Sequence, residues 1–481
     1  MNFKMIRYIL GHIMRVEAIL LLLPAVVSLL YQEGTFFCFL IPVLLLILLS
    51  ALCSFKKPEN RVIYAKEGFV IVALCWIVLS LFGALPFTLS GEIPSYVDSV
   101  FETVSGFTTT GASILTNVEG LSQGMLFWRS FTHWIGGMGV LVFVLAIIPL
   151  AGSRSMHLMR AESPGPSVGK LVPKIKSTAM ILYGIYIGIT FVEIILLVCG
   201  GMPLFDSVVT TFGTVGTGGF GIKNNSIAYY NSAYIDGVVT VFMILCGINF
   251  NIFYLLLLRE FGRAFRSEEL RWYLGIIACS ILLVTLNILP IYQNFLTAFR
   301  YAAFQVGSII TTTGYATADF NLWPEFSKTI LVLLMVLGAC AGSTGGGIKT
   351  SRLVIALKNI KRELKHMLHP RSVKQVQLDG KTVEDEVLSG VNVYLLLYAM
   401  IVCISFLLIS IDGFDFETTF TSVISAMGNI GPGLGDVGPV GNFSAYSAFS
   451  KIVLSLDMLF GRLEIFPMIM LFSPSLWRRK R

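Results

Sequence analysis

Charged residues are scarce in this chain. Asp, Glu, Lys and Arg make up 13% of its 481 residues, whereas 55% are hydrophobic. Soluble domains carry about 25% charged residues, so the composition predicts an integral membrane protein. The net charge of +7 does not indicate nucleic-acid binding, because the basic residues cluster between apolar runs, where the positive-inside rule expects cytoplasmic loops. These clusters lie at 56–66, 154–176, 259–271, 352–381 and 478–481.

Histidine and cysteine are too sparse to indicate a metal or catalytic centre. The five histidines and eight cysteines are scattered singly, and no spacing suggests a metal site or a disulfide framework. A polytopic membrane enzyme, the alternative from a different functional class, would need His, Asp or Cys clustered near one membrane face. We therefore expect no enzymatic activity and no catalytic residue.

Long apolar runs, by contrast, are abundant. A membrane-spanning helix needs about 20 apolar residues, and the first run lacks the small-residue cleavage site of a signal peptide. The basic N-terminal region and the basic tail predict that both termini lie in the cytoplasm. The candidate spans are 14–31, 35–54, 68–90, 124–151, 177–200, 232–258, 272–291, 328–357, 388–411 and 445–472.

Four further segments are too short to cross a membrane and too apolar for ordinary outer loops. They align on a final glycine as 98–111, 206–219, 301–314 and 418–431, and two of them end in Thr-Thr-Thr-Gly. A serine lies six residues before the glycine in three copies, and Gly213 takes that place in the second. The pattern predicts four repeats of span, short helix, glycine turn and span.

The expected architecture is therefore an all-α polytopic membrane protein with pseudo-fourfold symmetry around one pore. Two additional spans occupy 1–66, and the pore repeats occupy 67–152, 177–260, 271–358 and 387–474. A cytoplasmic loop at 359–386 and a basic tail at 475–481 complete the chain.

The four turns favour cation binding. A short helix that stops inside the membrane leaves its last carbonyls unpaired, which is tolerated only inside protein or beside a water-filled path. The negative ends of four such helices would face a common axis, and glycine lets the backbone approach an ion closely. Rings of carbonyls replace the hydration shell of K⁺ in potassium channels. The alternative is that these are interfacial turns only. The predicted K⁺ selectivity filter consists of Thr109, Thr110, Gly111, Gly218, Gly219, Thr312, Thr313, Gly314, Asn429, Ile430 and Gly431.

With these turns, the motifs at 134–139, 342–347, 429–435 and 461–466 make the chain resemble the Trk/Ktr/HKT superfamily of potassium transporters. The likeness is closest to the bacterial Trk-type membrane subunit, and the two additional N-terminal spans fit that branch. The resemblance implies K⁺ uptake across the bacterial cytoplasmic membrane. Members that pass Na⁺ often carry serine at the first filter position, so Gly111 implies a preference for K⁺.

The resemblance also implies partners. A cytoplasmic nucleotide-binding Trk-type regulatory subunit would dock on the cytoplasmic side, for which 359–386 is the candidate contact. The regulatory nucleotide would bind that partner, and the membrane subunit would form a homodimer. Coupling of K⁺ to H⁺ or Na⁺ in a symporter is the alternative within transport.

The segment 338–347 interrupts a predicted span with several glycines. Each glycine costs about 1 kcal/mol relative to alanine in a helix, so we expect a loop. The spacing of a phosphate-binding P-loop is absent, and a packing kink is the plain alternative. The resemblance implies a mobile gate beneath the filter, formed by Gly342, Ser343, Thr344, Gly345, Gly346, Gly347 and Lys349.

Few charged residues lie within the predicted spans. Arg462 is interpreted as a positive barrier in the pore below the filter, with a structural ion pair as the alternative, although Glu464 is too close in sequence to share its helical face. Glu193 would titrate in a symporter, but helix packing explains it equally well. No catalytic role is assigned to Arg129 or His133, and the role of position 133, where Trk members often have glutamine, stays open.

Overall fold

The computed structural model describes residues 1–59, 63–137, 139, 175–371 and 375–474. Within these residues the regular secondary structure is helical except for one antiparallel hairpin of β1 (Gln377–Leu378) and β2 (Lys381–Thr382). The predicted all-α polytopic architecture is therefore confirmed. The predicted tail at 475–481, the end of the first repeat and most of the basic cluster at 154–176 lie outside the described residues.

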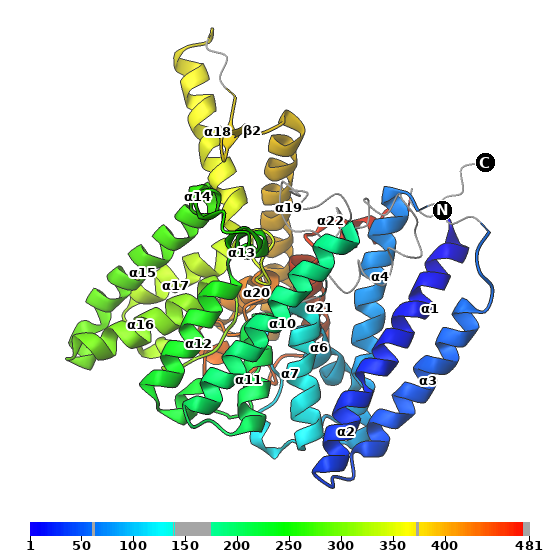
Figure 1. Cartoon of the computed structure of the whole chain (residues 1–481). Coiled ribbons are helices and arrows are strands. Elements are labelled where there is room, and N and C mark those ends of the chain that lie inside the picture. Colours follow the sequence, from blue (N-terminus) through cyan, green and yellow to red (C-terminus); the bar gives the residue numbers. More distant parts are fainter. Residues whose placement is uncertain (60–62, 138, 140–174, 372–374, 475–481) are drawn as a thin grey trace.

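The N-terminal helices stand beside the rest of the molecule. They are α1 (Phe3–Leu20), α2 (Leu22–Leu30) and α3 (Phe36–Ser54), all coloured dark blue in Figure 1. α1 and α2 together form an apolar stretch of 28 residues, so the first span begins earlier than the predicted residue 14. The hydrophobicity pattern missed this start because Lys4, Arg7 and Arg15 interrupt the apolar run.

Four pore helices form the inner layer of the molecule. They are α6 (Tyr96–Phe107), α11 (Leu204–Gly216), α16 (Phe295–Ile310) and α20 (Phe416–Gly428). Three of them begin with a side-chain cap, in which Ser95, Asn294 or Asp415 accepts a backbone N–H of the first turn, as expected for these residue types. Their other ends carry the predicted filter turns.

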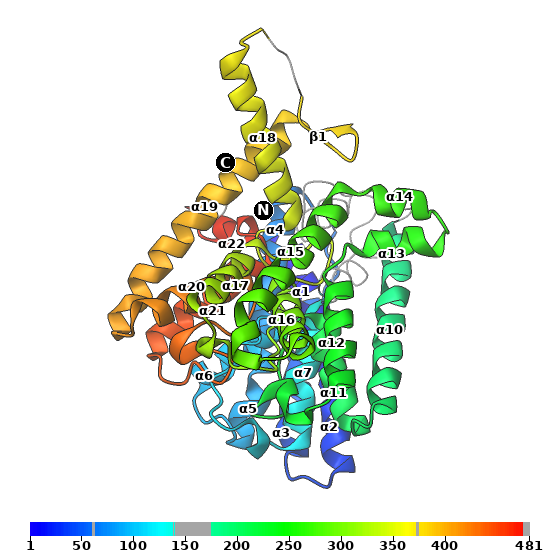
Figure 2. The same ribbon diagram turned by 90° about the vertical axis from the view of Figure 1, so that its left-hand side faces the viewer.

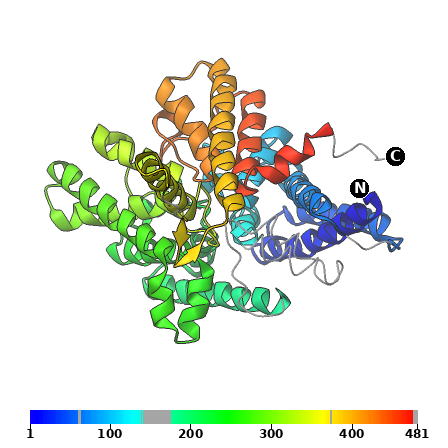
Figure 3. The same ribbon diagram turned by 90° about the horizontal axis from the view of Figure 1, so that it is seen from above.

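An outer helix precedes each pore helix, and a second helix follows it. The preceding helices are α4 (Ala65–Gly83, continued by α5, Leu85–Ser90), α10 (Ile175–Cys199), α15 (Glu268–Tyr292) and α19 (Asp385–Ile409). The following helices are α7 (Gln123–Gly137), α12 (Ala233–Cys246), α17 (Glu325–Leu337) and α21 (Ala448–Arg462). Seen from above, the four units succeed one another around a common centre in chain order (Figure 3).

Three of the predicted spans are interrupted. α12 and α13 (Phe250–Leu257) meet at 95°, and a loop joins α17 to α18 (Thr350–Leu368). α21 ends at Arg462, and the chain turns through Glu464 and Ile465, both at positive φ, before α22 (Phe466–Leu471). The predicted spans 232–258 and 445–472 therefore each contain a backbone break, which apolar composition does not reveal.

Six helices in the described part of the chain are long and apolar enough to cross a membrane, and the bent pair α12–α13 would be a seventh. The predicted segment 359–386 contains the end of α18, the hairpin and the start of α19. α18 projects beyond the helical body on the same side as α14 (Phe261–Arg266) in Figures 1 and 2.

Candidate functional site

Each pore helix ends in the same backbone motif. In the first repeat, the Thr109 N–H donates to the Gly106 carbonyl (3.1 Å) and the Thr110 N–H donates to the Ser105 carbonyl (2.9 Å). These two bonds define a Schellman cap, which closes a helix through one left-handed residue. The equivalent bonds recur with lengths of 2.8–3.2 Å from Thr217, Gly218, Thr312, Thr313, Asn429 and Ile430.

The four turns share an unusual pattern of backbone angles. Thr109 has a φ of 56° and Gly111 a φ of 83°. Threonine rarely adopts positive φ, and such a conformation costs about 1–3 kcal/mol unless the surroundings enforce it. The same pair of left-handed residues occurs as Thr217 and Gly219, Thr312 and Gly314, and Asn429 and Gly431.

Thr217 belongs to this set, although only Gly218 and Gly219 were predicted as filter residues in the second repeat. Thr217 lies two residues before the aligned glycine, as Thr109 and Thr312 do. The alignment of the repeats could therefore have identified Thr217 as a filter residue. The turn ring is hereafter the four segments 109–111, 217–219, 312–314 and 429–431.

The four turns meet edge to edge and close a ring. A Cβ atom on Gly111 would lie 2.1 Å from the Gly218 carbonyl oxygen of the second turn. A Cβ on Gly219 would lie 1.9 Å from the Thr313 oxygen, and one on Gly314 would lie 2.1 Å from the Ile430 oxygen. A Cβ on Gly431 would return to the Thr110 oxygen at 2.7 Å. Only glycine permits these approaches, because real Cβ contacts are longer and the neighbouring atoms are backbone.

Buried hydroxyl and amide groups hold the turns. The Oγ1 atoms of Thr108 and Thr110 lie 2.8 Å apart, and those of Thr311 and Thr313 are also 2.8 Å apart. The Asn429 amide donates to Thr110 Oγ1 (3.0 Å), joining the fourth turn to the first. All these residues have zero solvent exposure. Hydroxyl and amide groups therefore fix the turns against one another inside the protein.

In the second repeat, Gly213 replaces the serine that lies six residues before the final glycine in the other three repeats. The structure shows why a side chain does not fit at this position. A Cβ on Gly213 would lie 2.1 Å from the Tyr315 hydroxyl. That hydroxyl donates to the Thr210 carbonyl at 2.9 Å. Tyr315 therefore occupies the space that Ser308 and Ser425 fill in their own repeats, and it links the second and third repeats.

His133 joins two neighbouring repeats. Its Nδ1 lies 2.8 Å from the Gly106 carbonyl, and its Nε2 accepts the Phe220 N–H at 3.2 Å. Because a carbonyl can only accept and an amide N–H can only donate, these partners require a neutral ring with the proton on Nδ1. Sequence reasoning left this position open, since a single histidine in an apolar helix carries no pattern.

Arg129 is also structural. Its guanidinium forms a buried ion pair with Glu102 (2.5 Å), donates to the Gly221 carbonyl (2.7 Å) and lies over the Phe220 ring. It thus connects the first repeat to the segment that follows the second turn.

The glycine loop, residues 338–349, lies directly against the turn ring. The Gly346 N–H donates to Thr312 Oγ1 (2.7 Å). A Cβ on Gly346 would lie 2.4 Å from the Gly428 carbonyl, and one on Gly345 would lie 2.9 Å from the Thr311 carbonyl. Glycine at both positions therefore lets the loop backbone contact the ends of two pore helices.

Hydrogen bonds anchor the loop on its other sides. The Phe250 N–H donates to the Gly342 carbonyl (3.0 Å), and the Thr344 hydroxyl donates to the Cys246 carbonyl (3.2 Å). Ser343 donates to Cys340 within the loop (2.7 Å), and the buried Lys349 ammonium donates to the Gly345 carbonyl. At the base, a Cβ on Gly347 would lie 2.7 Å from Gly338 Cα. Individual hydrogen bonds therefore fix the position of the loop.

Arg462 connects this loop to the first repeat. Its two terminal nitrogens donate to the carbonyls of Thr344 (2.7 Å) and Gly136 (2.6 Å). A Cβ on Gly136 would itself lie 1.9 Å from the Phe107 carbonyl, so Arg462 lies close to the end of a pore helix. The nearby Glu464 pairs with Arg352.

Glu269 is a residue that sequence reasoning missed. One of its carboxylate oxygens accepts the Ala341 N–H (2.6 Å) and the Ser351 N–H (3.1 Å). The first donor lies in the glycine loop and the second lies in the first turn of α18, so a single side chain on α15 joins the loop to the helix that follows it. Glu193 is fully buried in α10, which packs against pore helix α11.

The chain is similar to potassium transport proteins over its whole length. A family model described as TrkH, a cation transport protein, matches residues 37–479. The Trk system potassium uptake protein TrkH of Salmonella typhimurium is 36% identical, over 99% of this chain and 100% of the relative. TrkG of Escherichia coli K12, also named a Trk system potassium uptake protein, is 32% identical over 99% of each chain. The crystal structure of the potassium transporter TrkH from Vibrio parahaemolyticus has a TM-score of 0.89 at 32% identity and covers 99% of this chain and 100% of that one.

Proposed function

The chain belongs to the TrkH family of cation transport proteins, and from this premise we propose that it takes up K⁺ through the turn ring. The closed ring of four backbone turns is the observation that carries this proposal. The same pattern of left-handed backbone residues in four repeats would give an ion backbone oxygens as ligands on every side. The function is transport across a bacterial membrane and is not enzymatic.

The proposed filter comprises the predicted residues together with Thr217. Enforced left-handed turns hold their oxygens in place before an ion arrives, so binding does not have to order them. Glycine at 111, 219, 314 and 431 lets adjacent turns touch without a side chain between them. Such a closed, crowded ring resists the rearrangement that a differently sized ion would require.

The glycine loop is the proposed gate. It touches the turn ring at Thr312 and is held by Glu269 and Arg462. A gate needs two positions of similar free energy, and a loop held mainly by individual hydrogen bonds can be released stepwise. Arg462 would both place positive charge near the pore and restrain the loop.

A cytoplasmic nucleotide-binding Trk-type regulatory subunit is the proposed partner, with the nucleotide on that subunit. The projecting α18 and hairpin form the candidate contact, because α18 begins where the glycine loop ends. A push on α18 would therefore act on the gate. Both termini are proposed to lie on this cytoplasmic side. Homodimerisation rests on the family resemblance, and the mass of the detergent-solubilised protein tests it.

Growth at low K⁺ tests the proposed function. A K⁺-uptake-deficient bacterium should grow at micromolar K⁺ when it expresses this chain with its regulatory subunit. Purified protein in liposomes should then conduct Rb⁺ down its own gradient. Flux that requires an imposed H⁺ or Na⁺ gradient would instead support the symporter, and failure of a well-inserted protein to restore growth would contradict K⁺ uptake.

A further inference from the structure

The hairpin of β1 and β2 reaches the start of α15. Asp379 and Gly380 form its turn, between the paired residues Leu378 and Lys381. Both turn residues have positive φ (51° and 74°), as a type I′ hairpin turn requires. The Asp379 carboxylate accepts the Glu268 N–H at 2.6 Å. These two residues are 111 positions apart in the sequence, so the contact joins separate parts of the chain.

Asp379 acts as the cap of α15. Ser267 precedes the helix, but its side chain makes no capping hydrogen bond. The first N–H groups of a helix have no partner within the helix, and the helix dipole favours a carboxylate beside them. The hairpin therefore supplies the acceptor that the residue just before a helix usually supplies.

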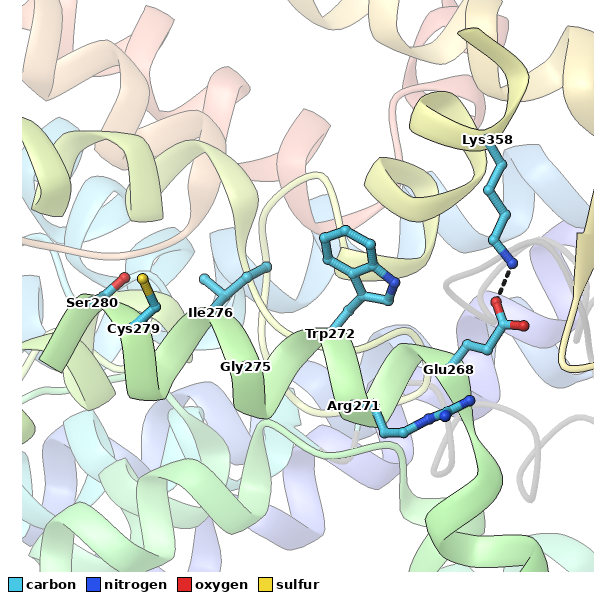
Figure 4. Close-up of a pocket in the computed structure, with 8 residues that line it drawn as sticks. All are labelled: Glu268, Arg271, Trp272, Gly275, Ile276, Cys279, Ser280 and Lys358. Carbon is cyan, nitrogen blue, oxygen red and sulfur yellow. Dashed lines mark hydrogen bonds and ion pairs between the residues drawn. The ribbon is translucent and has the colours of Figure 1, made fainter. Parts of the chain in front are cut away.

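Lys358 joins the same contact from α18. Its ammonium pairs with the Glu268 carboxylate and donates to the Gln377 carbonyl of β1 (2.7 Å). Figure 4 shows Lys358 reaching from α18 to Glu268 at the start of α15. The hairpin, α15 and α18 therefore meet at one point.

Apolar packing fixes the hairpin on its other side. Val376, just before β1, is 4% exposed and lies in a cluster with Ile355 of α18. Leu388 and Val391 of α19 complete this cluster. The Val383 N–H donates to the Val376 carbonyl (2.8 Å) and closes the base of the hairpin. The position of α18 and α19 is thus transmitted through the hairpin to the start of α15.

The residue next to this contact holds the glycine loop. Glu269 directly follows Glu268 and accepts the N–H groups of Ala341 and Ser351. Glu268 and Glu269 belong to the same helical turn and move together. A shift that separates Glu268 from Asp379 therefore also moves the Glu269 carboxylate relative to its donors.

We propose that Asp379 is a positioning residue for the glycine loop, because its cap on α15 holds Glu269 where it fixes the loop. The hairpin is then a latch, and a partner that lifts it from α15 releases the loop. The exposed hairpin side chains that such a partner can reach are Gln377, Lys381 and Thr382. The consequence for ion flux rests on the proposed gate, whereas the consequence for the loop itself does not.

Alkylation of Cys340 by N-ethylmaleimide tests the latch without any measurement of transport. Cys340 lies in the glycine loop and has 0% exposure, so the reagent reaches it when the loop opens or the protein unfolds. Cys75, which is equally buried on α4, reports unfolding alone. Both reactions are followed by peptide mass spectrometry on the full-length protein in detergent.

Two substitutions of Asp379 form a matched pair. Asp379→Gly keeps a residue that favours the left-handed turn but removes the acceptor, whereas Asp379→Asn keeps both the turn and an acceptor oxygen. We expect Asp379→Gly to speed Cys340 alkylation about fivefold with no change at Cys75, and Asp379→Asn to stay near the wild-type rate. An unchanged Cys340 rate in Asp379→Gly, or an equal rise at Cys75, would overturn the latch.

Combination with Glu269→Gln tests whether Asp379 acts through Glu269. If it does, Asp379→Gly should speed Cys340 alkylation less in the Glu269→Gln background than in the wild type. Effects of the two substitutions that multiply fully would overturn the positioning role. Basal Rb⁺ flux through the same proteins tests the gate separately. Faster alkylation without higher flux would support the latch and contradict the proposed gate.

Discussion

At the scale of single residues, His133 bridges the first repeat and the residue that follows the second turn, through its bonds to Gly106 and Phe220. Substitution of His133 tests whether the second turn depends on this bridge. Leucine would leave the Gly106 carbonyl and the Phe220 N–H unpaired, and each buried unpaired group costs about 1–3 kcal/mol. We expect His133→Leu to lower thermal stability and K⁺ selectivity, whereas His133→Gln, which keeps a donor and an acceptor, should retain most of both. Thermal unfolding and ion competition in liposomes measure these effects. Equal behaviour of the two variants would contradict the bridge.

Arg462 acts at the same scale, through two hydrogen bonds to backbone carbonyls. Arg462→Ala removes both bonds to the loop and to α7, so basal Rb⁺ flux should rise several-fold. Arg462→Lys keeps the charge but not the planar two-armed donor, and its flux should lie between those of Ala and the wild type. If the Arg462→Ala protein elutes normally on gel filtration and still shows wild-type flux, Arg462 does not restrain the glycine loop.

At the scale of elements, the glycine loop and α15 form one unit through Glu269. Glu269→Gln weakens two charge-assisted bonds by roughly 1 kcal/mol in total, so the ratio of closed to open loop should fall about fivefold. The measurement is basal flux without the regulatory subunit. Glu268→Gln is the matched control, because that neighbouring carboxylate pairs with Lys358 and not with the loop. A response of the control as large as that of Glu269→Gln would contradict the specific role.

Elements also show how far the sequence could predict the structure. The four pore helices and their turns were predictable, because a repeated glycine offset reports the same local geometry four times. The loop at 338–349 was predictable from its glycines. The breaks after α12 and α21 were not predictable. Gly247 and the segment 463–465 lie within largely apolar runs, and the composition of these runs predicts spans without a break. Glu269 and His133 were not predictable as contacts, since their partners are backbone groups far along the chain.

For the whole molecule, the main feature is that four unequal repeats close one ring. Differences between repeats are compensated locally, as where Tyr315 fills the space beside Gly213. Bridges such as Arg129 to Gly221, Lys451 to Asp98 and Asn429 to Thr110 run between repeats. All four repeats are therefore needed to form the turn ring. A change in one turn should alter the ion selectivity of the whole ring.

Ion selectivity of a single glycine variant tests this account most directly. Gly111→Ser places a Cβ against the Gly218 carbonyl, whereas Gly91→Ser introduces serine at a similar positive φ (77°) with nothing within 4 Å. Both proteins are reconstituted in liposomes, and Rb⁺ flux is measured in competition with Na⁺. We predict that the wild type and Gly91→Ser exclude Na⁺, and that Gly111→Ser loses about tenfold in discrimination, or about 1.4 kcal/mol. Undiminished exclusion of Na⁺ by a folded Gly111→Ser protein would contradict the turn ring as the selectivity filter.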